Sequence, residues 1–178
     1  EQKVNTRNPR STVGTTTEIY DYLKLLYARI GHTFSPVSGQ EVRCYSVDDV
    51  AAYIQQQGEG SRAVIAAPLV LAEGQGIIEK LTLLLSDGLM RVWTKGETRL
   101  IEDILPQVDE KTRAEEILVV IDRARIAADD DTQTRMRDSV ARAFSYGEGI
   151  CTVITDKGAT EFSSRFEADG IQFEHPSE

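Results

Sequence analysis

Four segments of the chain repeat hydrophobic residues at the three- and four-residue spacing of an amphipathic helix. In the first, residues 15–30, Thr15 and Glu18 can form a capping box, and Gly31 supplies the end. We expect this helix to bury one stripe of side chains, which consists of Ile19, Leu23, Leu26 and Ile30.

The other three predicted helices cover residues 46–57, 77–87 and 128–147. Ser46 opens the second helix, and the acidic run 129–131 suits the N-terminus of the fourth because a helix dipole favours negative charge there. The residues expected to face inward are Val47, Val50, Ile54, Ile77, Ile78, Leu81, Leu84, Leu85, Met136, Val140 and Phe144.

Alternating and β-branched residues predict strands in the remaining segments. These are 62–70, 89–93, 97–101, 117–126, 149–155, 159–164 and 171–174. Two adjacent pairs are separated by short turns and are expected to form hairpins, the first with Gly96 at its turn. Of these segments, 117–126 has the clearest strand pattern. The sequence therefore predicts an α+β fold, with helices packed on a small, mainly antiparallel sheet.

Composition places the chain among folded globular proteins. It has 178 residues, 40% of them hydrophobic, which is enough to bury a core. No apolar run approaches the ~20 residues of a membrane-spanning helix, and no signal-peptide pattern opens the sequence. The net charge of −9 argues against a large DNA-tracking surface, which needs clustered Lys and Arg. Cys44 and Cys151 could form a disulfide, but we expect two free thiols in a cytoplasmic protein.

Motifs for catalysis or nucleotide binding are missing. The sequence has neither a G-x-x-x-x-G-K-[ST] phosphate loop nor a strand leading into G-x-G-x-x-G. His32 and His175 lie in polar segments without a nucleophile nearby, and we expect both to face solvent. Residues 35–39 (SPVSG) would form a zinc knuckle with cysteines in place of Ser35 and Ser38, but serine hydroxyls are poor Zn²⁺ ligands. We therefore expect neither a catalytic site nor a bound metal in this chain.

Two predicted strands carry arginines on one face, because residues two apart on a strand point to the same side. The groups are Leu89, Arg91 and Trp93 in one strand and Ile121, Arg123 and Arg125 in the other. If the strands are neighbours, the sheet shows arginines beside the only tryptophan of the chain, and Arg and Trp are enriched where interface binding energy concentrates. This pattern favours an acidic protein partner. The alternative is that Trp93 belongs to the core and the arginines make weak surface pairs with Glu97, Asp122 or similar neighbours.

Six segments, taken in order along the chain, carry a resemblance to a known family. They are NPRSTVGTTTEIYDYLKLLYARIG at 8–31, SPVSG at 35–39, APLV at 67–70, LSDGLMRVW at 85–93, EEILVVIDRARI at 115–126 and TRMRDSVARAF at 134–144. Together they resemble the UvrA family, the ATP-dependent excinuclease components that recognise damage in bacterial nucleotide excision repair. The resemblance covers nearly the whole chain.

This resemblance implies that the chain is a piece of a larger protein, with an ABC-type ATPase scaffold interrupted by insertions. Residues 46–164 are similar to the insertion that binds UvrB, and residues 1–45 and 165–178 are similar to flanking parts of the scaffold. Gln2 resembles the Q-loop glutamine, which senses nucleotide and its Mg²⁺. The resemblance also implies that the parent protein, and not this chain alone, binds ATP, Mg²⁺, Zn²⁺ and damaged DNA and forms homodimers.

In the family, basic side chains of the UvrB-binding domain face acidic side chains of UvrB, and the matching positions here are Arg91 and Arg123. Trp93 and Arg125 are added as candidates by proximity alone. The chain departs from the family where SPVSG replaces a Cys/His pair and RFEADGIQF replaces a Cys-x-x-Cys. Two alternatives stay open, namely a nucleotide-binding fragment of the same ATPase and a module that contacts DNA directly.

Overall fold

The computed structural model describes residues 19–109, 111–168 and 171–173, which fall into two compact units. One unit consists of Glu1–Arg43 and Phe166–Glu178, and the other is Cys44–Arg165. The first contains helix α2 (Ile19–Ile30) and the short hairpin of β7 (Glu167–Ala168) and β8 (Ile171–Gln172). The second contains the main sheet and all other described helices.

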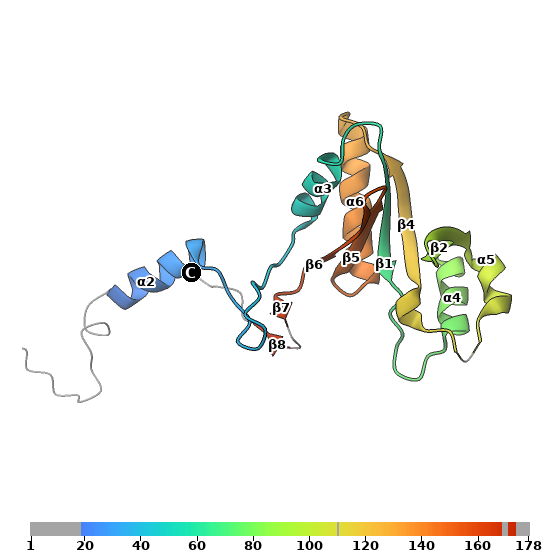
Figure 1. Ribbon diagram of the computed structural model, residues 1–178, viewed down its shortest axis with the longest axis horizontal. Coiled ribbons are helices and arrows are strands. Elements are labelled where there is room, and N and C mark those ends of the chain that lie inside the picture. Colours follow the sequence, from blue (N-terminus) through green and yellow to red (C-terminus); the bar gives the residue numbers. More distant parts are fainter. Residues whose placement is uncertain (1–18, 110, 169–170, 174–178) are drawn as a thin grey trace, which may run out of the picture. The chain divides into compact units, whose positions relative to one another are not determined.

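A six-stranded antiparallel sheet forms the centre of the Cys44–Arg165 unit (Figure 1). The strands are β1 (Arg62–Pro68), β2 (Arg91–Thr94), β3 (Glu97–Leu100), β4 (Leu118–Arg125), β5 (Ile150–Thr155) and β6 (Gly158–Ser163). Their order is β3-β2-β4-β1-β5-β6, so the two hairpins flank the central pair β1–β4. The predicted α+β class is confirmed.

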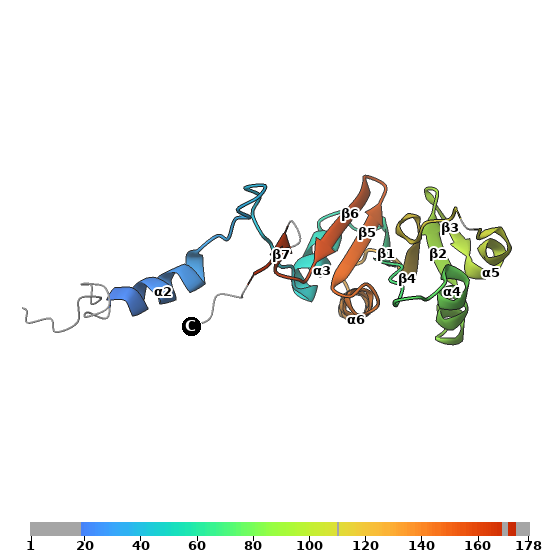
Figure 2. The same cartoon turned by 90° about the horizontal axis from the view of Figure 1, so that it is seen from below.

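Helices pack on one face of this sheet, as Figure 2 shows for α4 and α6. The helices of this unit are α3 (Val47–Gln55), α4 (Ile77–Ser86), α5 (Ile101–Ile104) and α6 (Asp130–Tyr146). Ser46 starts α3 with a capping box, in which its backbone N–H donates to Asp49 Oδ2 at 2.8 Å. Asp129 starts α6 by accepting a hydrogen bond from the N–H of Thr132 at 2.8 Å. No helix in the described part of the chain is long and apolar enough to cross a membrane.

Two apolar clusters fill the space between the sheet and the helices. The first joins α3 and α6 to β1, β5, β6 and the end of β4, and the second joins α4 and α5 to β2 and the start of β4. Register pairs Ala67 of the first cluster with Val119 of the second, so both clusters lie on the same face. Ile121 and Tyr146 contact both clusters and join them.

A β-bulge interrupts the pairing of β1 with β4. Ile65 pairs with Asp122 and the next residue, Ala66, pairs with Val120, so Ile121 is an extra residue in β4. Because a bulge shifts the alternation of side chains by one residue, Ile121 and Asp122 both turn toward the helices. Arg123 then points to the opposite face, away from Ile121. The predicted grouping of Ile121 with Arg123 and Arg125 is therefore wrong.

The β2–β3 hairpin turns through two residues, Lys95 and Gly96. Their φ angles are 52° and 82°, and positive φ at both central positions is typical of the tight turns that match the twist of a hairpin. Gly96 adopts this backbone without the penalty that a side chain would add. The predicted hairpin with Gly96 at its turn is confirmed.

The helix expected near the start of the chain is present as α2, but its hydrophobic stripe is not buried as predicted. Ile19, Leu23, Leu26 and Ile30 are 52%, 44%, 50% and 66% exposed. The apolar spacing predicted a helix with one hydrophobic face. Among the described residues, no core packs against that face. The predicted capping pair, Thr15 and Glu18, lies outside the described residues.

A second difference lies after the first hairpin. Ile101 was expected at the end of a strand, but it begins α5 instead. Ile101 and Ile104 are one helical turn apart, and both are buried in the second cluster. Burial of these two side chains on α4 and β2 explains why a short helix forms where the sequence is otherwise polar.

Leu81 and Leu83 provide a matched test of the second cluster, because both lie in α4. Leu81 is fully buried, whereas Leu83 is 49% exposed. We expect Leu81→Ala to lower the free energy of unfolding by about 2–5 kcal/mol, since it removes apolar contacts and leaves a cavity. Leu83→Ala should lower it by less than about 1 kcal/mol. Urea denaturation of both variants measures the difference, and equal losses would contradict the assignment of this core.

Candidate functional site

The face of the sheet opposite the helices carries the candidate residues. Val92 pairs with Val119, and both are buried against α4, so their neighbours Arg91 and Trp93 point to the other face. After the bulge, the side chains of Arg123 and Arg125 point to this face too. We call it the open face. Its residues on the central strands are Arg91, Trp93, Leu118, Val120, Arg123, Arg125, Arg62 and Val64.

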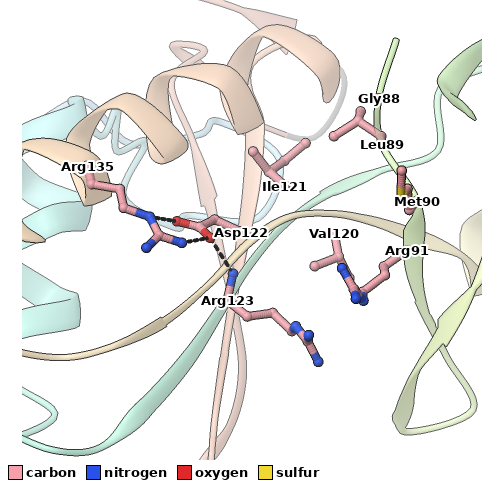
Figure 3. A pocket seen from close by; sticks show the side chains of 9 residues that line it. All are labelled: Gly88, Leu89, Met90, Arg91, Val120, Ile121, Asp122, Arg123 and Arg135. Atoms are coloured by element: carbon pink, nitrogen blue, oxygen red, sulfur yellow. Dashed lines mark hydrogen bonds and ion pairs between the residues drawn. The ribbon is translucent and has the colours of Figure 1, made fainter. Parts of the chain in front are cut away.

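Arg91 and Arg123 line one pocket of about 270 Å³, which we call the first pocket (Figure 3). Both side chains are exposed, Arg91 from β2 and Arg123 from β4. The other lining residues are Gly88, Leu89, Met90, Val120, Ile121, Asp122 and Arg135. The strands that carry the two arginines are neighbours, as the candidate patch required. The partner-binding role of these residues stays a prediction.

Asp122 lies at the edge of the first pocket and is bound to α6. Its carboxylate accepts hydrogen bonds from Arg135 Nε at 2.9 Å and Arg135 Nη2 at 2.6 Å, so the pair is bidentate. Ser139 Oγ donates to the same carboxylate at 3.0 Å, and the backbone N–H of Arg123 donates at 2.8 Å. Burial by itself would raise the pKa of the Asp122 carboxylate. The hydrogen bonds that it accepts, chiefly from Arg135 and Ser139, outweigh burial and hold its pKa below the usual value.

The carboxylates expected to pair with the candidate arginines have other partners. Asp122 pairs with Arg135, and Glu97 pairs with Arg99 at 3.7 Å. Within the part of the chain that the structure describes, the side chains of Arg91, Arg123 and Arg125 have no ion pair or hydrogen bond. The expected alternative, surface pairs of these arginines with Glu97, Asp122 or similar neighbours, is therefore not present among the described residues. Their positive charge is available to another molecule.

Apolar surface borders the first pocket. Met90 is 58% exposed, and Leu100, the cross-strand partner of Arg91, is 40% exposed. Trp93 is half-buried and lies opposite Leu118, so it is neither a core residue nor fully accessible. A partner surface that combines carboxylates with apolar side chains fits this arrangement best.

Sequence reasoning missed Arg62, which lies on the open face directly opposite Arg125. Arg62 begins β1, more than fifty positions before Arg125 in the sequence, and no local pattern links the two. Only the pairing of β1 with β4 brings them together. A count of basic residues at alternate positions of both strands could have nominated Arg62, but the register was needed to place it.

Hydrogen bonds within residues 35–39 stabilise the turn that contains Ser35 and Ser38. Ser35 is buried, and its hydroxyl accepts hydrogen bonds from the N–H of Val37 at 3.2 Å and of Ser38 at 3.5 Å. The N–H of Gly39 donates to the carbonyl of Ser35 at 2.9 Å. The hydroxyl thus holds the turn by hydrogen bonds from the backbone.

Both cysteines and the described histidine behave as the sequence predicts. Cys44 and Cys151 are free thiols, and burial raises the pKa of Cys151 to about 12. His32 is exposed and pairs with Glu41. Gln2 and His175 lie outside the described residues. In the described ranges, no group of three or more His, Cys, Asp and Glu side chains is placed to hold a metal ion.

Comparison with known proteins gives a consistent result. Residues 45–157 match the family described as the UvrA interaction domain. Proteins named UvrABC system protein A are similar to the chain, with 39% identity over 84% of it in Rhizobium meliloti, 37% over 99% in Methanothermobacter thermautotrophicus and 36% over 93% in Thermus thermophilus. The chain spans only 15%, 19% and 17% of these relatives, respectively.

The contacts of Asp122 predict a pH-dependent contribution to stability. Asp122→Asn should lower the free energy of unfolding at pH 7 by about 1–3 kcal/mol, because Arg135 and Ser139 lose their charged acceptor. The folded-state pKa lies below the unfolded value of about 3.9. The contribution is therefore complete above that unfolded value and is lost as pH falls through the folded-state pKa.

Urea denaturation at several pH values tests this prediction. The difference between the wild type and Asp122→Asn should be constant from about pH 5 to 8 and shrink below about pH 4. The control is Asp138→Asn, an exposed aspartate of α6, the helix that carries Arg135 and Ser139, and it should change stability little at any pH. A difference for Asp122→Asn that stays constant down to pH 2 would contradict the assignment.

Proposed function

The chain belongs to the UvrA interaction-domain family, and from this premise we propose that its Cys44–Arg165 unit docks UvrB in a UvrA-like protein of nucleotide excision repair. The observation that supports this proposal most is the first pocket. Two exposed arginines, Arg91 and Arg123, line it without a partner among the described residues. An acidic partner would supply the missing carboxylates.

The charges of the first pocket favour carboxylates as the ligand. Asp122 offsets the charge of Arg135, so the net positive charge comes from Arg91 and Arg123. A guanidinium group presents its N–H donors in a planar fork that matches the two oxygens of a carboxylate. Each arginine can therefore hold one Asp or Glu side chain in a bidentate pair, which fixes orientation as well as charge.

The first pocket attracts a carboxylate only at short range, because the chain as a whole is acidic. The net charge of −9 repels an acidic partner at long range. At physiological salt, charges separated by more than about 8 Å are largely screened. A carboxylate that reaches the open face is then affected mainly by the nearest arginines. Such charge complementarity determines partner choice and association rate more than total affinity.

The relatives are much longer than this chain, so we propose further roles for other segments of a longer UvrA-like protein. In it, ATP with Mg²⁺, Zn²⁺ and damaged DNA would be bound by other segments, and homodimers would form through them. Trp93 and the apolar residues Met90 and Leu100 would contact apolar side chains of UvrB beside the arginine pairs. This division of roles accounts for a candidate site in which the charges left without an ion pair among the described residues are arginines bordered by apolar surface.

Charge reversal at the first pocket tests the proposal. Arg91→Glu and Arg123→Glu should each weaken UvrB binding about tenfold or more, and the double variant should weaken it further, because acidic groups then face acidic groups. Biolayer interferometry with purified UvrB measures this. Melting temperatures should stay close to the wild-type value, since neither side chain has a partner among the described residues.

Arg142→Glu is the matched control. Arg142 is an exposed arginine of α6, which packs on the other face of the sheet, so its reversal makes the same change in net charge away from the pocket. It should leave UvrB binding near the wild-type value. Equal binding by the wild type and the Arg91→Glu/Arg123→Glu double variant would overturn the proposed role of the first pocket.

A further inference from the structure

The basic surface extends beyond the first pocket, across β4 to β1. A second pocket of about 410 Å³ lies there. Its lining residues are Arg62, Ala63, Val64, Thr98, Arg123, Ala124 and Arg125. Arg123 lines both pockets, so the two form one continuous surface. Among the residues that the structure describes, no carboxylate lines the second pocket.

Strand register places like charges against each other in this pocket. Arg62 lies directly opposite Arg125, and Arg123 lies opposite Val64 on the same face. Like charges directly opposite on an antiparallel pair are destabilising. Nothing among the described residues offsets this repulsion, because Arg62, Arg123 and Arg125 all lack an ion pair or side-chain hydrogen bond there.

The chain does not lack carboxylates that could pair with these arginines. It has 29 acidic residues against 20 Lys and Arg residues, so carboxylates are plentiful. Several exposed arginines do have acidic partners, as Arg135 has Asp122 and Arg137 has Asp48. Three arginines therefore gather in one pocket that no carboxylate among the described residues lines, which leaves a positively charged surface open to an anion.

We propose that the second pocket, lined by Arg62, Arg123 and Arg125, binds a second group of carboxylates from the same acidic partner that contacts the first pocket. This inference rests on the proposed function. Arg123 and Arg125 are two residues apart on one strand, a spacing of about 7 Å. An extended segment with acidic residues two apart presents its carboxylates at the same spacing. The partner's contact is thus an extended acidic segment, aligned with β4, that spans both pockets.

A protein segment fits this surface better than nucleic acid does. The phosphate backbone is a continuous polyanion, and the acidic remainder of the chain would repel it along its length. Val64, which lies on the same face as Arg123, adds apolar surface to the second pocket, and this surface suits the aliphatic part of a Glu side chain. Duplex DNA is therefore included as the competing ligand in the test below.

Charge-neutral substitutions in the full chain test the second pocket. Arg62→Gln and Arg125→Gln should each raise the Kd for UvrB about fivefold, the size expected for a contributing interface residue. Arg142→Gln, on the other side of the sheet, should leave Kd unchanged. Arg62→Gln should also keep or raise the melting temperature at low salt, because it removes the repulsion from Arg125. If Arg62 stabilises the fold instead, Arg62→Gln should lower the melting temperature.

The outcomes separate this inference from the proposed function. If Arg91→Glu weakens UvrB binding but Arg62→Gln and Arg125→Gln do not, the second pocket is excluded and the proposed function stands. If the wild-type chain does not bind UvrB, the proposed function fails, and a synthetic peptide of alternating Glu and Val then tests the second pocket by itself. Shifts of the Arg62 and Arg125 side-chain NMR signals on peptide addition would support it, and no shift, or a shift with duplex DNA alone, would overturn it.

Discussion

Ile121 is the extra residue of β4 at the bulge opposite Ile65 and Ala66, and its position determines which side chains of that strand face the helices. Before the bulge, Val119 faces the core with Val92. After it, Ala124 and Ile126 face the core, and Arg123 and Arg125 point outward. A regular strand would have turned these two arginines toward α6. The open face with its arginines therefore depends on one inserted residue, which itself packs against both apolar clusters.

The same bulge separates a neutralised charge from charges that have no ion pair in the described part of the chain. Asp122 turns toward α6, where Arg135 and Ser139 bind its carboxylate. It is therefore not available to Arg123, the next residue along the strand. Pairing and hydrogen bonding offset the cost of partly burying a carboxylate, and the Asp122 side chain, which is 14% exposed, has both. The result is a link between β4 and α6 on one face and, on the other, guanidinium groups without an ion pair among the described residues, where binding of an acidic protein is proposed.

Local features of this fold could be predicted, because they depend on residues close together in sequence. Ser46 and Asp129 start helices by hydrogen bonds within one turn, and Gly96 permits the hairpin turn. Alternation in β2 placed Arg91 and Trp93 on one face. The bulge at Ile121 and the pairing of Arg62 with Arg125 depend on contacts between distant strands, so the sequence pattern did not contain them. In the same way, the spacing in α2 predicted an apolar stripe but not what would cover it.

We propose that the open face of the sheet, and not the face covered by helices, meets the acidic partner. The most direct measurement is NMR of the ¹⁵N-labelled chain during titration with UvrB. The account predicts that the signals that change first belong to β2 and β4 around Arg91 and Arg123, while those of α6 around Arg142 stay unchanged. Changes confined to α3 and α6, with the signals of both arginines unaffected, would contradict it.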